Sequence, residues 1–392
     1  FEGGKVTIND GDLFTLTTKE VLGNNTIGSI SYKNLINDVQ IGTSILVNDG
    51  LIELKAEKID DTDIVCRVIN GGIISDRKAI NVPGVHLSLP FLSDVDRRDL
   101  EFAMKTGFDF FALSFVRCAE DVLEVRRLQK EHNNTSKLIA KIESQEGVEN
   151  LDAIIDVADG IMVARGDMGV EIPFEKVPVV QKDMISKCLK SGKFVIVATQ
   201  MLESMTHNPR PTRAEVNDVA NAIFDQTSAV MLSGESAAGD YPVEAVKTMS
   251  RICHEIEKTT TTGKFEITYN GSNLASSIAC AACSIASVIN ADAIIPVSLS
   301  GSTIRKVSGF RPNIAIIGCS TNECVCRETS LMWGVTPVLI TEQADGEALI
   351  NEVISKCKTA GVIKSGNRVV IVAGFPLRIA GATNMIRVVD VE

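Results

Sequence analysis

The sequence predicts an α/β protein in which a β/α barrel is preceded by a small β-rich domain and followed by a doubly wound α/β domain. Residues 1–84 alternate apolar and polar positions, residues 85–254 alternate short apolar runs with amphipathic stretches, and residues 255–392 repeat that second pattern. A chain of 392 residues, 45% of them hydrophobic, is also too long for one ordinary core. We therefore expect three domains with these boundaries.

The first region is predicted to consist of short strands separated by tight turns. Asn-Asp-Gly occurs at 9–11 and 48–50 and Asn-Gly-Gly at 70–72, and such tripeptides between β-branched runs are good hairpin signals. We expect a small β-barrel or a sandwich. The expected strands are Lys5–Ile8, Leu13–Thr18, Thr26–Tyr32, Ser44–Val47, Leu51–Ile59 and Asp63–Val68.

The second region alternates buried strands with helices. Nearly continuous apolar strands, each followed by a helix, indicate a parallel sheet that is covered on both sides. Five such units in succession, with polar residues just after the strands, favour a barrel over an open sheet. The expected strands are Asp109–Phe115, Leu138–Ile142, Gly160–Ala164, Phe194–Thr199 and Ala229–Leu232, and the helices include Ala119–Glu131, Gly147–Val157, Phe174–Ser191 and Arg213–Phe224.

The third region starts with a Thr-rich link at 259–262, which leads to an Ala-rich helix at 273–290. Strands and helices then alternate again, which predicts a doubly wound α/β domain. The expected strands are Ala293–Val297, Ile314–Gly318, Val335–Ile340 and Arg368–Ala373.

Composition restricts the function classes. A net charge of −11 and a pI near 5.1 argue against a nucleic-acid partner, but a local field can still bind an anionic substrate. No apolar run approaches the roughly 18 residues that span a membrane. The ten cysteines are scattered, as is typical of free thiols in a cytoplasmic protein, and the four histidines lie too far apart in sequence to indicate a metal site.

A lysine and two carboxylates follow the predicted strands. Lys141 and Glu143 share one face of their strand, where burial is costly without a purpose; the alternative is a structural ion pair. Asp167 lies between Gly166 and Gly169 where a helix starts, a place suited to anion binding, although it can also be a helix N-cap. Glu143 and Asp167 supply the oxygen ligands that Mg²⁺ or Mn²⁺ prefers.

Three hydroxyl-bearing positions complete the candidates. Thr199 ends its strand and, by alternation, shares a face with Val197 and Val195; the alternative role is a helix cap. Ser114 ends the strand before Lys141. The Ser-rich loop, with Ser298, Ser300, Gly301, Ser302 and Thr303, lies between a strand and a helix. It is either a phosphate-binding loop or an ordinary N-cap.

Five motifs carry a family resemblance. KIE at 141–143, MVARGDMG at 162–169, ATQMLES at 198–204, PRPTRAE at 209–215 and MLSGES at 231–236 resemble, in this order, segments of pyruvate kinases of the bacterial type. The similarity covers essentially the whole chain. It implies an eight-stranded (β/α)8 TIM barrel with an inserted small β-barrel domain and a C-terminal α/β domain. It also implies phosphoryl transfer from phosphoenolpyruvate to ADP, giving pyruvate and ATP.

The resemblance assigns roles to individual residues. Lys141 matches the lysine that stabilises charge on the phosphoryl group and the enolate, and Glu143 and Asp167 match the metal ligands. Gly166, Asp167 and Thr199 match residues that bind the substrate carboxylate, with Thr199 near the methylene that gains a proton. Ser114 is grouped with these substrate-binding residues. In the small β domain, Lys78 matches a nucleotide-contacting lysine.

The family also implies partners. The Ser-rich loop matches the site of a sugar-phosphate or nucleotide effector, faced by a second loop at 374–383, and the assembly is expected to be a homotetramer. Pyruvate kinases begin with three further strands carrying Asn-x-Ser-His-Gly and Asp-Thr-Lys-Gly-Pro-Glu segments, which do not occur in this sequence. These segments hold ligands for K⁺, which we therefore expect to act through residues outside the chain.

A barrel with five of eight strands exposes two unpaired edges, so we expect the sequence to be a fragment of a longer gene product.

Two alternatives to an active pyruvate kinase remain. One is an inactive truncated paralogue that binds an effector or a partner. Phosphoenolpyruvate mutases and acid aldolases also combine a barrel with carboxylate-bound Mg²⁺, but they lack the two additional domains.

Overall fold

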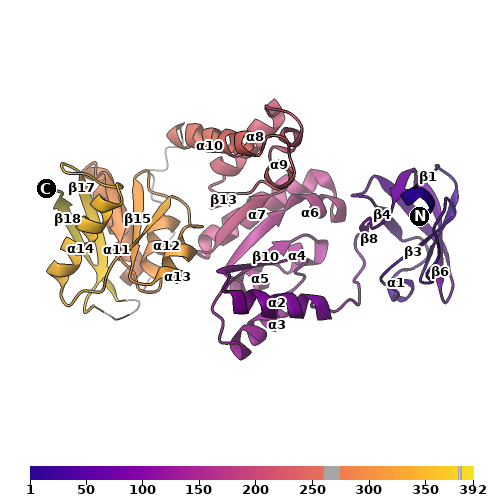
Figure 1. Ribbon diagram of the computed structural model, residues 1–392, viewed down its shortest axis with the longest axis horizontal. Helices are drawn as coiled ribbons and strands as arrows, with labels where there is room; N and C mark the ends of the chain where they lie inside the picture. Colours follow the sequence, from indigo (N-terminus) through magenta and orange to yellow (C-terminus); the bar gives the residue numbers. More distant parts are fainter. Residues whose placement is uncertain (260–273, 378, 380–381) are drawn as a thin grey trace.

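The computed structural model describes residues 1–259, 274–377, 379 and 382–392. It consists of three parts in a row, with the β-rich part at one end and the C-terminal part at the other (Figure 1). Residues 260–262 of the expected link lie outside the described residues. Among the described helices, none combines the length and apolar character that a membrane crossing requires.

The β-rich part packs two sheets around one core, which includes Phe14, Ile45 and Leu54. One sheet has the order β3-β2-β6-β5-β4-β8, and the other pairs β1 with β7. The strands are β1 (Lys5–Ile8), β2 (Leu13–Thr17), β3 (Ile27–Ser29), β4 (Ser44–Val47), β5 (Ile52–Ile59), β6 (Asp63–Asn70), β7 (Gly72–Ser75) and β8 (Ile80–Asn81), with the short helices η1 (Glu2–Gly4) and α1 (Leu35–Asp38).

Strand β7 was not predicted from the sequence, because the glycines before it indicated only a turn. The backbone at Gly71 passes so close to β1 that a Cβ there would lie 2.4 Å from the carbonyl oxygen of Ile8. Its N–H donates to Asp10 Oδ1 at 2.7 Å. The absence of a side chain at this position therefore allows the chain to reverse and β7 to pair with β1.

The central part contains a parallel sheet with the order β13-β12-β11-β10-β9. Each strand lies beside its neighbour in sequence, as in the wall of a barrel and unlike a doubly wound sheet, whose order reverses. The strands are β9 (Phe110–Leu113), β10 (Lys137–Ile142), β11 (Gly160–Ala164), β12 (Phe194–Ala198) and β13 (Ala229–Val230).

The helices of this part follow the strands. Helices α3 and α8 have the predicted bounds, whereas the helix predicted at 147–157 is two helices separated at Asn150, whose side chain donates to Arg117 O at 3.0 Å. The helices are α2 (Asp94–Thr106), α3 (Ala119–Glu131), α4 (Gln145–Glu149), α5 (Leu151–Val157), α6 (Arg165–Glu171), η2 (Phe174–Lys176), α7 (Val177–Lys190), η3 (Glu203–Thr206), α8 (Arg213–Phe224), α9 (Gly234–Ala237) and α10 (Pro242–Thr259).

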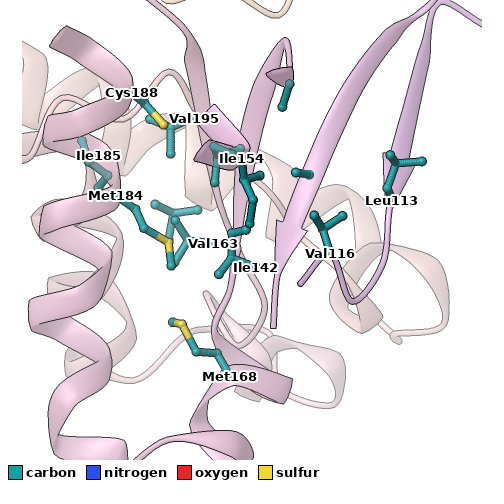
Figure 2. Packing of buried hydrophobic residues seen from close by; sticks show 14 of the residues in the cluster. Leu113, Val116, Ile142, Ile154, Val163, Met168, Met184, Ile185, Cys188 and Val195 are labelled. Carbon is teal, nitrogen blue, oxygen red and sulfur yellow. The ribbon is translucent and has the colours of Figure 1, made fainter. Parts of the chain in front are cut away.

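The two faces of this sheet are packed differently. On one face, strand residues such as Val163 and Val195 form a core with Met184 and Ile185 of α7 (Figure 2). On the other face, Ile139, Met162, Ile196 and Ala198 form a smaller cluster. Because Lys141 lies two residues beyond Ile139 in β10, alternation assigns it to this second face, away from the helices.

The C-terminal part has helices on both faces of a sheet with the order β16-β15-β14-β17-β18. Strand β18 was not predicted, and it pairs antiparallel with β17 at the edge. Its elements are α11 (Leu274–Val288), β14 (Ala293–Pro296), α12 (Ser302–Gly309), β15 (Ala315–Ser320), α13 (Glu323–Thr329), β16 (Val335–Leu339), α14 (Gly346–Thr359), β17 (Arg368–Gly374) and β18 (Thr383–Asp390).

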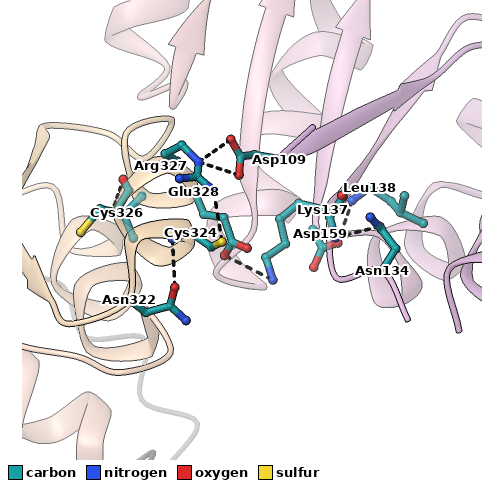
Figure 3. Close-up of polar contacts among 12 residues, drawn as sticks. Asp109, Asn134, Lys137, Leu138, Asp159, Asn322, Cys324, Cys326, Arg327 and Glu328 are labelled. Atoms are coloured by element: carbon teal, nitrogen blue, oxygen red, sulfur yellow. Dashed lines mark hydrogen bonds and ion pairs between the residues drawn. The ribbon is translucent and has the colours of Figure 1, made fainter. Parts of the chain in front are cut away.

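The C-terminal part contacts the amino-terminal ends of the central strands. Arg327 Nε donates to both carboxylate oxygens of Asp109, at 3.0 and 2.9 Å, and Lys137 Nζ lies 3.4 Å from Glu328 Oε2 (Figure 3). Asp109 precedes β9, and Lys137 opens β10. This docking leaves the carboxyl ends of the strands free for chemistry.

The domain boundary expected between residues 254 and 255 falls inside α10, which continues without a break to Thr259. The amphipathic pattern of this helix gives no signal at residue 254. All ten cysteines are free thiols, consistent with the expectation from their spacing.

Helix α8 offers a test of stability. Glu215 accepts hydrogen bonds from the backbone N–H groups of Ser204 and Thr212, each at 2.7 Å, and from both hydroxyls. Burial raises its pKa, but these hydrogen bonds outweigh burial, and the net pKa is lowered. We expect Glu215→Gln to reduce the free energy of unfolding by about 1–2 kcal/mol at pH 7.

The sign of the pH dependence follows from the lowered pKa. The stabilisation is fully present above the unfolded value near 4.5 and is lost as the pH falls through the folded value below it. Urea titrations from pH 7 to pH 3 measure this, with Glu175→Gln as the exposed control. An equal difference between wild type and variant across the whole range would contradict the prediction.

Candidate active site

The carboxyl ends of β9 to β12 bring most of the predicted site residues together. Lys141, within β10, places its Nζ 2.8 Å from Glu143 Oε1, just beyond the strand. The same ammonium donates to Ser114 Oγ, which follows β9, at 2.9 Å. The predicted shared face of Lys141 and Glu143 is thus observed, and Ser114 lies on it.

Glu143 is a buried carboxylate, only 1% exposed. Its Oε2 accepts a hydrogen bond from the Phe115 N–H at 2.5 Å. Burial raises the pKa of Glu143, the hydrogen bonds and charge of Lys141 and Phe115 lower it, the charge of Asp167 raises it, and the net pKa is raised. Burial and the nearby charge of Asp167 both oppose ionisation of this carboxylate. A bound cation would favour the ionised form, because its positive charge offsets both effects.

This pair of carboxylates fits a divalent metal of the magnesium type. Such ions are commonly held by one or two carboxylates, with substrate oxygens and water completing the shell. In the part of the chain that the structure describes, no group of three or more His, Cys, Asp or Glu side chains forms a closed metal site. A zinc-type cage is therefore not present among these residues, whereas an open oxygen site is compatible with Glu143 and Asp167.

Asp167 is not an N-cap. Helix α6 starts at Arg165 with Ala164 as its N-cap, and Asp167 lies in the first turn. Its negative charge lies near the positive end of the helix, where it is stabilised. The structural alternative of a capping role is therefore wrong for this residue.

Thr199 reaches the site in a way that alternation does not predict. Strand β12 ends at Ala198, and Thr199 and Gln200 have φ values of +68° and +53°. These left-handed residues break the period of two, so Thr199 does not continue the face of Val195 and Val197, and that prediction was wrong. Instead, its Oγ1 accepts a hydrogen bond from the Gly166 N–H at 2.8 Å and donates to Ala198 O at 2.6 Å.

Comparison with known proteins identifies the family. The model for the pyruvate kinase barrel domain matches residues 1–246, and that for the pyruvate kinase alpha/beta domain matches residues 276–389. A pyruvate kinase of Clostridium acetobutylicum is 45% identical over 100% of this chain and 84% of its own length. One from Staphylococcus aureus (strain MRSA252) is 44% identical over 98% of this chain and 67% of its own. The chain belongs to the pyruvate kinase family.

A solved pyruvate kinase structure has the same fold as this chain. The crystal structure of a pyruvate kinase from Cryptosporidium parvum superposes with a TM-score of 0.90 at 38% identity, covering 100% of this chain and 81% of that one. The predicted fold class is confirmed: a TIM-barrel domain, an inserted small β domain and a C-terminal α/β domain. As a pyruvate kinase, the chain is a phosphotransferase that passes the phosphoryl group of phosphoenolpyruvate to ADP, and the family requires a divalent metal and K⁺. The comparisons support this enzyme and not an inactive paralogue.

Within this pyruvate kinase, Lys78 is exposed in the loop between β7 and β8 of the β-rich part, whereas the Lys141 group lies in the central part. A cavity of about 1200 Å³ is lined by residues from both the end of the β-rich part and the central part, including Asn81, Ser114 and Asp167. Asn81 Nδ2 donates to Glu171 Oε1 at 2.9 Å between these two parts.

The Ser-rich loop lies at the switch point of the C-terminal sheet, because β14 has β15 on one side and β17 on the other. Thr303 Oγ1 lies 2.7 Å from Thr383 Oγ1, and Ser302 Oγ accepts a hydrogen bond from Lys306 Nζ at 2.8 Å. Ser298 and Thr303 line a cavity of about 70 Å³ with Gly374. Residues 378, 380 and 381 of the second predicted loop lie outside the described residues.

Sequence reasoning missed Arg165, although it lies within one of the motifs. Its guanidinium contacts Asp218, Thr199, Ala198 and Met201, which are 33 to 53 residues away. A charged residue at the junction between an apolar strand and a helix was the available signal.

Proposed function

We propose that this pyruvate kinase transfers the phosphoryl group at the carboxyl ends of β10 to β12, with Lys141 as its catalytic cation. The observation that carries the proposal is the position of Lys141 Nζ, 2.8 Å from the buried Glu143 and 2.9 Å from Ser114. An ammonium has three donors. Two are used by these side chains, and the third is available for a transferring phosphoryl oxygen or an enolate oxygen.

Glu143 and Asp167 are proposed to hold the divalent cation, Mg²⁺ or Mn²⁺. When bound, such an ion supplies positive charge to the phosphoryl oxygens. Glu143 also orients Lys141 through their 2.8 Å contact, and its burial keeps water from competing for that contact. The raised pKa of Glu143, caused first by burial, fits a carboxylate whose charge a bound cation would stabilise.

Gly166, Asp167 and Thr199 are proposed to bind the carboxylate of phosphoenolpyruvate. The 2.8 Å hydrogen bond from the Gly166 N–H to Thr199 Oγ1 supports a common binding surface, since it brings the start of α6 beside the end of β12. We place Thr199 beside the methylene that gains a proton, and we assign Lys78 to the nucleotide. Lys78 is exposed in the β-rich part, so this role requires the β-rich part to close over the cavity.

A coupled assay of pyruvate formation tests the proposal. We expect turnover with phosphoenolpyruvate, ADP and Mg²⁺ together, and none when ADP or the divalent ion is omitted. Turnover without ADP would favour a mutase or aldolase type of reaction instead. Addition of K⁺ is expected to increase the rate, as in the family. Binding of a sugar bisphosphate without any pyruvate formation would support the non-catalytic alternative.

We further propose that the Ser-rich loop binds a phosphate group of an effector, such as a sugar phosphate or a nucleotide. Ligands of doubly wound sheets bind at the carboxyl ends of the strands where the order reverses, and this loop follows β14 at that point. The amino end of α12 adds backbone N–H groups that favour an anion.

Calorimetry with fructose 1,6-bisphosphate tests this loop. Ser302→Asp places a negative charge at the start of α12 and is expected to weaken binding at least tenfold, because like charges repel at a helix end that would hold phosphate. Ser355→Asp, on the exposed face of α14, is the matched control and is expected to bind like wild type. Equal binding by both variants would contradict the assignment.

A cytoplasmic homotetramer is the assembly that we propose. Ten free thiols fit a reducing compartment. Exposed apolar side chains on α8 and α10, including Val216, Val243 and Val246, fit burial against a second copy. Light scattering after size exclusion would distinguish four copies from one.

A further inference from the structure

Arg165 has no role in the proposed chemistry, yet it lies between Ala164 and Gly166 at the point where β11 passes into α6. Its side chain is only 11% exposed. Burying a guanidinium requires that its charge be paired and its donors satisfied. The hydrogen-bond partners of the guanidinium therefore indicate the role of Arg165.

All three guanidinium nitrogens of Arg165 contact protein groups. Nε donates to Ala198 O at 3.3 Å, and one terminal nitrogen donates to both oxygens of Asp218 at 2.7 and 2.6 Å. The other terminal nitrogen donates to Thr199 O at 2.6 Å and contacts Met201 Sδ at 2.8 Å. Each of the three guanidinium nitrogens is therefore engaged by the protein itself, which argues against direct binding of a substrate phosphate by Arg165.

Three of these contacts converge on the turn that carries Thr199. Thr199 and Gln200 both have positive φ, a conformation that non-glycine residues adopt only when their surroundings enforce it. Because of this turn, the carbonyl oxygen of Thr199 lies outside the hydrogen-bonding pattern of the sheet and needs another donor. Arg165 supplies a charged donor to this oxygen and to that of Ala198.

Asp218 holds the guanidinium from the opposite side. It lies on α8, which packs outside the sheet, and its carboxylate accepts two hydrogen bonds from Arg165. This charge-assisted pair holds one terminal nitrogen of the guanidinium, while the bonds from Nε and the other terminal nitrogen fix its orientation. The turn at Thr199 is thus connected through Arg165 to helix α8.

We propose that Arg165, anchored by Asp218, is a positioning residue that keeps Thr199 Oγ1 beside the Gly166 N–H. The inference rests on the role proposed above for Thr199. A lysine at position 165 keeps the charge but cannot span Asp218 and two carbonyl oxygens at once. The hydroxyl of Thr199 would then sample orientations away from the substrate, and kcat would fall, whereas binding of ADP would not change.

A double-mutant cycle tests the inference. The variants are Arg165→Lys, Thr199→Ala and both together, with the exposed Arg127→Lys as the matched control. Arg165→Lys is expected to lower kcat about 10–100-fold, with the KM for ADP within twofold of wild type. The double variant is expected to be no slower than Thr199→Ala, because Arg165 acts only through that side chain. Multiplicative losses in the double variant would overturn the inference.

A second readout separates positioning from general destabilisation. Exchange of the pyruvate methyl protons with deuterium, followed by NMR, reports on the proton step assigned to Thr199, and Arg165→Lys is expected to slow this exchange as much as it slows kcat. Binding of Mn²⁺ is expected to be unchanged. Unimpaired exchange would contradict the inference.

The Thr199→Ala variant separates failure of the role proposed for Thr199 from failure of the role inferred for Arg165. Full activity of Thr199→Ala would reject the role proposed for Thr199, and the inference would fail with it. An impaired Thr199→Ala with multiplicative losses rejects the inference alone. If Arg165→Lys does not fold, Asp218→Asn removes the anchor while leaving the arginine, and the same cycle with Thr199→Ala is expected to show the same non-additivity.

Discussion

Replacing Lys141 by methionine is expected to lower kcat for pyruvate formation by on the order of 10²–10³ or more, because an aligned cation is removed from the point where charge develops. Lys141 Nζ is held 2.8 Å from Glu143 and 2.9 Å from Ser114, so its charge costs no reorganisation during the reaction. Methionine has a similar length and no charge. The variant therefore isolates the electrostatic contribution.

The coupled pyruvate assay measures this effect at saturating phosphoenolpyruvate, ADP and Mg²⁺. Lys130→Met, on the exposed face of α3, is the matched control and is expected to retain wild-type activity. The thermal unfolding midpoint of each variant reports whether the fold is intact. Full activity of a folded Lys141→Met enzyme would reject Lys141 as the catalytic cation.

The second large effect is expected for Glu143→Gln. Glutamine has nearly the same shape and can still accept the hydrogen bond from the Phe115 N–H, but it carries no charge for the metal or for Lys141. We expect kcat/KM to fall on the order of 10²-fold or more at a fixed Mg²⁺ concentration, since both the cation site and the lysine lose their anionic partner. Higher Mg²⁺ is expected to recover part of the loss.

Glu171→Gln is the matched control for this variant, because it removes a partly buried carboxylate. Glu171 is also a carboxylate whose pKa is raised by burial, with a further contribution from Asp167, but it accepts a hydrogen bond from Asn81 and has no role in the proposed site. Titration of each variant with Mn²⁺, followed by electron paramagnetic resonance, is expected to show weakened binding only for Glu143→Gln. Equal affinities for the two variants would remove Glu143 from the metal site.

Local pattern was sufficient for the regular elements. Helices α3 and α8 and strand β11 have the predicted bounds, because the periods of 3.6 and two are properties of short segments. The elements that were missed have other origins. Helix α2 follows the capping box of Ser93 and Asp96, a signal that was present but not used. Strand β7 pairs with β1, which is distant from it in the sequence, so short-range pattern does not indicate it.

The site residues also differ in whether local sequence pattern predicts their position. Lys141 and Glu143 are two residues apart in sequence, so strand alternation alone places them on one face. Thr199 is beyond the end of its strand, and its direction depends on a left-handed turn that Arg165 contacts from the start of helix α6. No period in the sequence encodes that contact.

By itself, the sequence determined the class of the fold, the motifs at the strand ends and the pairing of Lys141 with Glu143, because each depends on neighbours a few residues apart. The tertiary structure decided how Thr199 faces Gly166, how Arg165 is anchored by Asp218 and how the C-terminal part docks below the barrel strands. These features join residues that are 33, 53 and 218 positions apart in the sequence. Such contacts form only when packed elements bring distant residues within hydrogen-bonding distance, and the physical reason is that a hydrogen bond acts over about 3 Å whatever the separation along the chain.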